Sequence, residues 1–422
     1  MMTTETVNVQ DEKKSAFLGS ISSAFQGAET YATLRKSAWD TLSKFAIPGT
    51  KTEAWKYTRV GKVINHSWMK SHGNSQINLP EIAIGGLRYV FVDGLFRADL
   101  SDELTYPGLN IRRTGENAEN NLLGTLSNHQ GDWFEALNAA FFNDGLVIEV
   151  DKNAQIDRPV HLVFFTSEEN TASFSRNVLS LQESSSLHVF THYIGSEHST
   201  FSSVVTEAFV GKNAALKIDK IQEGNETAFH HVDWTKQDRD SRFDITTVTL
   251  KSSWVRNDLN IRVAGENCHS SLTGAYLPSG KEHVDNHTMV DHMVPNCESD
   301  EKYKGIVREN ATAVFNGKVF VRPDAQKTNA FQQNANIVLD DTATMFSKPE
   351  LEIYADDVKC SHGSTTGQFD EEAVFYLRAR GIGEVMARKL LVEAFLADVI
   401  TTLSDERLQT YCTEKIQQLM HS

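Results

Sequence analysis

More than 200 consecutive residues of this 422-residue chain consist of short strand-like runs with almost no helical periodicity. They extend from Gly145 to about Asp356, beginning with Leu146–Val150 and ending with Leu351–Tyr354. Fifteen strand starts precede Ala343, an average spacing of about 14 residues for one strand and one turn. A β-sandwich closes on itself after roughly 100 residues, whereas a parallel β-helix keeps adding equivalent strands. The even strand density therefore favours a parallel β-helix.

A turn-like phrase of polar, then small, then apolar residues recurs between these runs. Ala154 and Ala214 occupy equivalent places in this phrase, and so do Ala311 and Ala343. Both intervals suit a coil of roughly 30 residues that holds two flattened strands. We therefore predict a mainly β protein with its β-helix core over residues 141–365.

Helical periodicity is confined to the two ends of the chain. Apolar residues recur at spacings of three and four over residues 11–45, and Trp133–Phe142 predicts a short helix. Between them, Asp93-Gly94 separates two strand-like runs, which is a strong signal for a β-hairpin. We predict an N-terminal helical domain with a small β-hairpin over residues 1–140.

The helical period returns at Asp370, which suits an N-cap because Glu371 and Glu372 follow in the first turn. We predict a C-terminal helical domain over residues 366–422 that caps the open end of the β-helix. Three short helices bury only part of their apolar area on one another, so we also expect a face that docks a partner. The predicted docking residues lie on the longest of these helices: Met386, Leu390, Phe395 and Val399.

Charge and composition narrow the range of partners. The formal net charge of −15 argues against nucleic acid or an anionic membrane as the main partner. We find no run of about 18 apolar residues that could span a bilayer, and no secretory or transit pattern at the start of the chain. Four widely spaced cysteines do not form a disulfide framework, so we expect reduced thiols and a cytoplasmic protein.

Nucleotide binding and hydrolytic chemistry find little support in the sequence. The closest approach to a phosphate loop is Gly274–Glu282, where five residues separate the glycines and Glu282 replaces the hydroxyl that would hold Mg²⁺. We interpret this segment as a β-turn and expect no ATP site. Nucleophile-elbow and zinc-protease motifs are also lacking, so we expect a protein that is not an enzyme.

Two histidines on one strand-like run, His283 and His287, raise the possibility of a metal site. Four extended residues place their Cα atoms ~13 Å apart, too far for both rings to reach one zinc at ~2.1 Å without bending the strand. We therefore expect these histidines to be hydrogen-bonded in a polar ladder.

The segment Cys360-Ser361-His362-Gly363 has a different spacing. In an extended strand Cys360 and His362 lie ~7 Å apart on one face, close enough for both side chains to reach one soft metal or cluster edge. One Cys and one His cannot complete a four-ligand site. They either supply part of a site shared with another chain or form an ordinary pair at the end of the last strand.

A long stretch around this pair resembles the signature of the SufB/SufD family of iron–sulfur cluster assembly proteins. The resemblance extends from about Pro48 to Leu403. The segments that carry it are Trp55–Thr58, Ala136–Phe142, His287–Ile306, Lys348–Gly363, Thr366–Gln368 and Asp370–Gly381.

The resemblance implies a right-handed parallel β-helix between two helical domains, within a complex of SufB, SufD and two copies of the ATPase SufC. In the family SufB and SufD pair through their β-helices, and each C-terminal helical region holds one SufC. The Cys-Ser-His-Gly segment resembles the SufD branch, which implies a non-catalytic scaffold subunit that leaves ATP to SufC. Cys360 and His362 would then lie close to a nascent cluster at the interface with SufB, as a partial, shared ligand set.

An alternative stays open at this point: a SufB-like principal scaffold that assembles the cluster itself, as a homodimer. A complete cysteine set would favour that alternative, whereas four scattered cysteines favour the first. In either case we expect no metal, cluster or cofactor bound stably by the chain alone. An isolated chain would pair with a second copy of itself.

Overall fold

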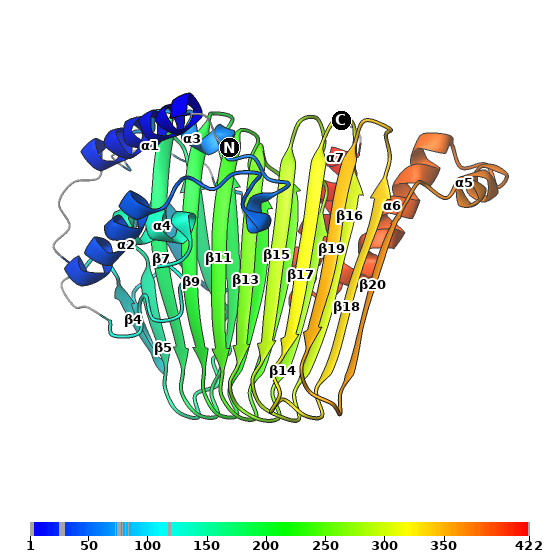
Figure 1. Ribbon diagram of the computed structural model, residues 1–422. Helices are drawn as coiled ribbons and strands as arrows, with labels where there is room; N and C mark the ends of the chain where they lie inside the picture. Colours follow the sequence, from blue (N-terminus) through cyan, green and yellow to red (C-terminus); the bar gives the residue numbers. More distant parts are fainter. Residues whose placement is uncertain are drawn as a thin grey trace.

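The computed structural model describes residues 4–24, 30–71, 73, 77, 79–80, 82, 84–116 and 120–420. Within these residues two long sheets pack face to face, and strands that follow one another in the chain alternate between them (Figure 1). Strands two apart in the sequence therefore become parallel neighbours, as in the pairs β8–β10 and β9–β11. The predicted parallel β-helix with helical regions at both ends is confirmed.

From β5 onward the strands alternate between the sheets, so the first sheet carries β1, β2 and then the even-numbered strands from β6. In spatial order it contains β2 (Leu95–Phe96), β1 (Leu87–Val92), β6 (Val160–Thr166), β8 (Ser186–Gly195), β10 (Ala215–Glu223), β12 (Arg242–Lys251), β14 (His269–Tyr276), β16 (Glu298–Val307), β18 (Asn329–Val338) and β20 (Lys359–Gly367). The second sheet contains β19 (Thr344–Ile353), β17 (Thr312–Val321), β15 (His283–His292), β13 (Trp254–Val263), β11 (Thr227–Gln237), β9 (Thr200–Val210), β7 (Thr171–Leu181), β5 (Leu146–Val150), β4 (Leu109–Arg113) and β3 (Thr105–Tyr106).

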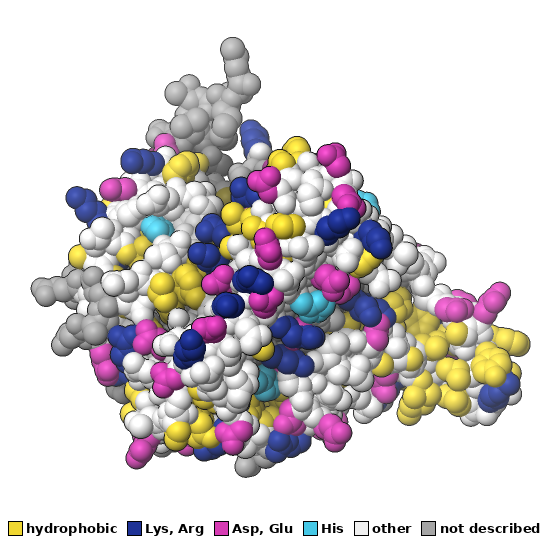
Figure 2. Space-filling view, turned by 90° about the horizontal axis from the view of Figure 1, so that it is seen from below, with side chains coloured by type: hydrophobic (Ala, Val, Ile, Leu, Met, Phe, Trp, Pro, Cys, Tyr) yellow, Lys and Arg dark blue, Asp and Glu magenta, His cyan; other side chains and the backbone are white. Residues whose placement is uncertain are grey.

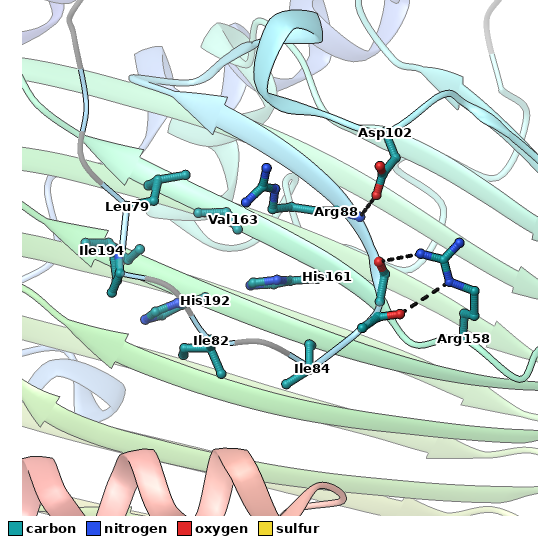
Figure 3. A pocket seen from close by; sticks show the side chains of 13 residues that line it. Leu79, Ile82, Ile84, Arg88, Asp102, Arg158, His161, Val163, His192 and Ile194 are labelled. Atoms are coloured by element: carbon teal, nitrogen blue, oxygen red, sulfur yellow. Dashed lines mark hydrogen bonds between the residues drawn. The ribbon is translucent and has the colours of Figure 1, made fainter.

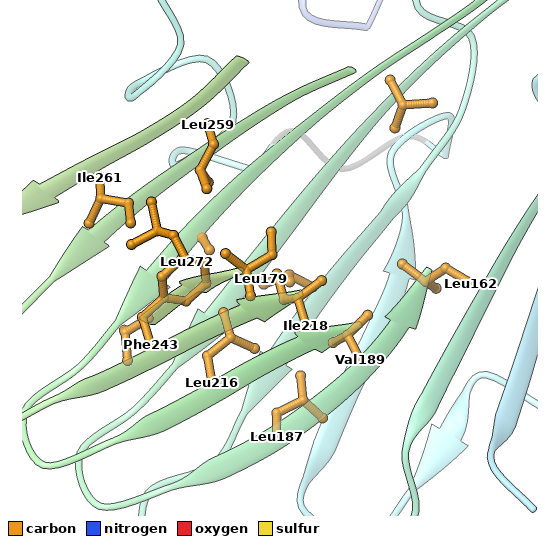
Figure 4. Packing of buried hydrophobic residues seen from close by; sticks show 14 of the residues in the cluster. Leu162, Leu179, Leu187, Val189, Leu216, Ile218, Phe243, Leu259, Ile261 and Leu272 are labelled. Atoms are coloured by element: carbon orange, nitrogen blue, oxygen red, sulfur yellow. The ribbon is translucent and has the colours of Figure 1, made fainter. Parts of the chain in front are cut away.

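Stacked apolar side chains fill the space between the sheets. Val189, Ile218, Ile245 and Leu272 occupy one register position in four successive strands of the first sheet. All four are buried in the main core cluster, together with residues of the second sheet such as Ile261 (Figure 4). Because each coil repeats the register of the one before, these four apolar residues lie one above another. That stacking is what holds the coils together.

The recurring turn phrase marks the corners of the coils. Asn153 and Asn213 adopt positive φ angles of 64° and 55°, a conformation that Asn tolerates better than most residues. Ala154 and Ala214 follow them at one corner, with Ser185 between them in the intermediate coil, so the interval between the two alanines spans two coils. A small residue fits this place because the corner turns inward over the core.

The N-terminal segments cover the outer face of the second sheet near its first coils. They comprise α1 (Thr4–Ala24), α2 (Ala32–Lys44), η1 (Glu53–Trp55), α3 (Gly61–Ile64) and α4 (Trp133–Phe141), whereas η2 (Ala98–Leu100) lies beside β1 of the first sheet. Phe17 and Phe134 pack with Phe174 and Phe201 of β7 and β9 in a second core cluster. The predicted hairpin around Asp93 is confirmed as β1 and β2, and β1 also pairs in parallel with β6.

The C-terminal helices α5 (Glu371–Arg378), α6 (Glu384–Ile400) and α7 (Glu406–Leu419) begin at N-caps or short turns. The Asp370 side chain accepts a hydrogen bond from the Ala373 N–H, as the predicted N-cap requires. Buried residues of α6 and α7, such as Leu396 and Ile416, pack on the outer face of the first sheet beside Val248. Our prediction that these helices cap the open end is therefore wrong: they lie along the flank, because the outer face of the first sheet is itself apolar.

None of the helices in the described part of the chain combines the length and the apolarity that crossing a membrane requires.

Candidate functional site

Cys360 and His362 lie on β20, the last strand of the first sheet (Figure 1). In the parallel ladder Cys360 is paired with Ala330, and His362 with Gln332. Both partners are buried and face the interior of the β-helix. Because residues paired in a ladder point to the same side, Cys360 and His362 share the interior side of the final coil, as their spacing predicts.

The two side chains differ in environment. Cys360 is half-buried and packs against a small apolar cluster that includes Val319 and Ala330. Burial raises the pKa of its thiol, so the free chain holds Cys360 as a thiol rather than a thiolate. His362 is exposed at the end of the β-helix. The pair is therefore accessible from the open end of the β-helix. The Cys360 thiol, which is the soft ligand of the pair, needs a neighbouring positive charge to lose its proton.

The interior directly beneath this pair is polar. The Gln332 amide donates a hydrogen bond of 2.7 Å to Glu301, which also accepts one of 2.5 Å from Thr288. Glu301 is fully enclosed, and burial raises the pKa of its carboxyl to about 7. The sequence analysis missed this column; its signal is polar residues at interior-facing positions of β16 and β18.

The final coil ends without a covering element among the described residues. β20 and β19 are the terminal strands of the two sheets, so each has a parallel neighbour on one side. Nearly every residue of β20 is exposed, and Phe331, Ile353 and Tyr354 expose apolar surface nearby. Backbone N–H and C=O groups on the free edges can pair with another chain.

His283 and His287 take part in the polar ladder that we predicted. The His283 Nε2 lies 2.8 Å from the Thr58 hydroxyl, and the His287 Nε2 lies 3.1 Å from an Asp285 oxygen. Arg256 donates to the same Asp285 carboxylate at 2.8 Å. Across the described ranges, no three His, Cys, Asp or Glu side chains are grouped so that they could hold a metal ion.

The segment Gly274–Glu282 forms the turn that we expected rather than a phosphate loop. The Glu282 side chain accepts a hydrogen bond from the Ser279 N–H, and the Glu282 N–H donates to the Ser279 carbonyl. Gly280 has a φ of +62°, which closes the turn. The turn therefore has the Glu282 carboxylate at the place where a phosphate loop has a hydroxyl.

The four predicted docking residues of α6 do not share one face. Met386 and Leu390 are 48% and 39% exposed, whereas Val399 is buried against the first sheet. Phe395 is half-buried beneath the ammonium group of Lys304, 4.7 Å from its ring centroid. The prediction of a shared face is wrong because the five-residue step from Leu390 to Phe395 turns about 140° around a helix. The docking role itself stays a prediction.

Three residues that the sequence analysis missed extend the exposed part of that face. Phe375, Tyr376 and Val385 are 71%, 56% and 70% exposed. With Met386 and Leu390 they form what we name the α5–α6 patch, and hydrophobic side chains gather on this projecting lobe in Figure 2. The available signal was the run Val374–Leu377: a short helix cannot bury four consecutive apolar residues on one face.

A pocket of about 270 Å³ lies on the outer face of the first sheet, beneath the segment that leads into β1 (Figure 3). Its floor contains His161 and His192. The His192 Nε2 is hydrogen-bonded to the Glu223 carboxylate at 2.7 Å. Burial holds the pKa of His161 well below its usual value. Arg158 at the rim donates to the carbonyls of Gly85 and Gly86. These interactions tie the leading segment to the sheet.

Residues 164–395 match the SufBD core domain of the SUF system for FeS cluster assembly. The iron–sulfur cluster assembly protein SufD of Escherichia coli is 30% identical over 388 residues, covering 89% of this chain and 90% of the relative. A SufBD family protein of Synechocystis is 28% identical over 400 residues, covering 89% and 88%. The SufD protein of Bacillus subtilis is 24% identical over 288 residues, covering 67% and 66%.

Proposed function

This chain belongs to the SufBD family of iron–sulfur cluster assembly proteins, and from that membership we propose that it is the SufD-type, non-catalytic scaffold subunit of a SufBCD complex. The observation that carries the proposal is the uncovered final coil. Its free strand edges can accept another β-helix, and Cys360 and His362 lie on its interior side. SufB is the proposed partner at this end, and a second copy of the chain takes its place when SufB is absent.

In this arrangement Cys360 and His362 contribute to a site that the partner completes. A thiolate and an imidazole are suitable ligands for iron, and two ligands hold a cluster less firmly than a closed set of four. A weak, shared site suits a scaffold that must pass its cluster on. The nascent cluster is thus cargo at the interface, and the chain alone binds no metal or cofactor stably.

The alternative of a SufB-like scaffold requires further ligands from this chain. Cys268, Cys297 and Cys412 are buried, the first two at a corner of the β-helix and the third in α7. None of the three lies on β20 beside Cys360. The position of the thiols therefore favours the shared site over a site built by this chain alone.

The ATPase SufC is the proposed partner of the α5–α6 patch, and it supplies the nucleotide chemistry. Five exposed apolar side chains on a projecting lobe are a surface that a protein partner can cover. We further propose that the assembly works in the cytoplasm. Neither nucleic acid nor a membrane has a role in this proposal.

Co-expression of the chain with SufB and SufC, followed by affinity capture, tests the proposal. The variants are Cys360→Ala and His362→Ala, and the matched control is Ser361→Ala, which changes the opposite side of the same strand. We expect all three to capture SufB and SufC like the wild type, and the first two to lose cluster content. Normal cluster content in both, or a loss of capture that parallels the loss of cluster, would contradict the ligand role.

A further inference from the structure

Two cysteines that are well separated in the sequence become neighbours at one corner of the β-helix. Cys268 directly precedes β14 and Cys297 directly precedes β16, and these strands pair in register from His269 and Glu298 onward. The Glu298 N–H donates a hydrogen bond of 2.9 Å to the Cys268 carbonyl. The two cysteines therefore occupy the same place in successive coils.

Their thiols turn toward a common acceptor. The Gly265 carbonyl oxygen lies 3.0 Å from the Cys268 Sγ and 3.3 Å from the Cys297 Sγ, which keeps the two sulfur atoms close together. Paired residues in neighbouring strands have Cα atoms about 5 Å apart, within the range of about 4.4–6.8 Å that a disulfide spans. Both side chains are thus placed for a bond between coils.

The corner also favours reaction at one of the two sulfurs. Both thiols are buried, but each directly follows an exposed turn residue, Asn267 or Asn296. A hydrogen bond from the Cys297 thiol lowers the pKa of the Cys268 thiol below its usual value. Because the thiolate is the reactive form, Cys268 is the better nucleophile and Cys297 the better resolving thiol.

We propose that Cys268 and Cys297 are an oxidisable pair, which a hydroperoxide converts to an intrachain disulfide that joins two successive coils. The Cys268 thiolate attacks one peroxide oxygen and the O–O bond breaks, which gives a sulfenic acid and, after protonation, water. The Cys297 sulfur then attacks the Cys268 sulfur, the S–O bond breaks, and a second water leaves. Two thiols are oxidised and one hydrogen peroxide is reduced. This chemistry is independent of Cys360 and of the proposed scaffold role.

Hydrogen peroxide added to the reduced, folded full-length chain tests the pair. After unfolding, free thiols are blocked with a maleimide and the peptides are identified by mass spectrometry. We expect a linked peptide that contains Cys268 and Cys297, reversible by dithiothreitol, and a higher midpoint of thermal unfolding for the oxidised chain. Full maleimide labelling of both cysteines, at a peroxide dose that oxidises the half-buried Cys360, would overturn the proposal.

Serine variants distinguish the nucleophilic thiol from the resolving thiol without disturbing the corner. Ser241 occupies the equivalent place one coil earlier, where its hydroxyl lies 3.4 Å from the Cys268 Sγ, so serine fits this position. In Cys297→Ser we expect peroxide to leave a sulfenic acid on Cys268 that dimedone traps, with no rise in the thermal midpoint. A linked peptide between Cys268 and another cysteine in this variant would contradict the assignment of Cys297 as resolving thiol.

Discussion

At the scale of single residues, buried charges decide how the N-terminal segment is held. Arg256 pairs with Asp258 and Asp285 at 2.8 Å, donates to the Ala54 carbonyl, and stacks 4.5 Å from the Trp55 ring centroid. Its side chain is 3% exposed and that of Asp285 is 1% exposed. The Trp55 loop thus closes over the buried ion pair of Arg256 and Asp285.

We expect Arg256→Ala to lower the free energy of unfolding by about 3–5 kcal/mol, because it leaves the buried carboxylate of Asp285 without its guanidinium partner. The matched control is Arg242→Ala, which breaks an equally short pair with Asp244 on the surface and should cost about 0–1 kcal/mol. Urea unfolding of both variants measures the difference. Equal losses in the two variants would show that burial of the Arg256 network adds nothing.

Glu301 makes stability depend on pH in a predictable direction. Burial raises the pKa of its carboxyl to about 7 in the folded chain, above the value of about 4.3 in an unfolded chain. The folded state therefore binds the proton more tightly, and the stability that this proton contributes is lost as pH rises through about 7. Glu301→Gln keeps the shape without a titrating proton: its amide oxygen accepts from Gln332, and its amide nitrogen donates to the Thr288 hydroxyl once that hydroxyl rotates.

We expect the advantage in stability of Glu301→Gln over the wild type to grow by about 2–3 kcal/mol between pH 5 and pH 8. Urea unfolding of both chains at the two pH values measures this difference. The contributions of the other titrating groups cancel because they are the same in the variant and the wild type. Glu298→Gln on the same strand, where the side chain is exposed, should show no such divergence. A constant difference at both pH values would mean that Glu301 titrates normally.

At the scale of elements, α6 has one buried and one exposed side. Its buried side, including Leu396 and Val399, covers the apolar outer face of the first sheet. Its exposed side contributes Met386 and Leu390 to the α5–α6 patch. Ending the chain after Gly381 would remove both sides at once and uncover the sheet, so substitutions are the cleaner way to test docking.

We expect Val385→Ser combined with Met386→Ser to reduce capture of SufC at least about tenfold, equal to about 1.4 kcal/mol of binding, with little change in unfolding. Leu396→Ala is the matched control on the buried side of α6. It should lower stability by about 2–5 kcal/mol. Affinity capture together with thermal unfolding distinguishes the two effects. Undiminished capture by the double variant would place the docking surface elsewhere.

At the scale of the whole molecule, the two ends of the β-helix differ. The first coils lie beneath the N-terminal helices and the hairpin, whereas β19 and β20 end the sheets with free edges (Figure 1). The Lys359 N–H donates to the carbonyl of Thr328, which directly precedes β18, so the backbone groups of successive β20 residues alternate between facing β18 and facing outward. By this alternation Thr366 presents its N–H to the free edge and Thr365 presents its N–H to β18.

We expect Thr366→Pro to fold like the wild type and to reduce recovery of SufB, because proline removes an outward N–H and is tolerated on an edge strand. Thr365→Pro should instead weaken the pairing of β20 with β18 and lower the thermal midpoint. Capture of SufB and circular dichroism on both variants separate these outcomes. If Thr366→Pro captures SufB at full strength, the partner does not pair along β20.

The sequence alone determined those features that depend on neighbours within a few residues. The spacing of apolar residues separated helical ends from a β core, Asp93-Gly94 marked a hairpin, and Asp370 marked a helix start. Strand rise alone kept His283 and His287 apart and put Cys360 and His362 on one side of a strand. Each of these follows from local backbone geometry, which a short segment carries with it.

Only the tertiary structure decided which residues of different coils stand above one another. Ser241, Cys268 and Cys297 share a corner although stretches of unequal length separate successive members. A repeat whose length varies in this way cannot be counted to the residue, so neither the thiol pair nor the column of Gln332 and Glu301 was predicted. The same reason applies to α6 and α7: whether they cap the end or cover the flank depends on which surface of the assembled coils is apolar.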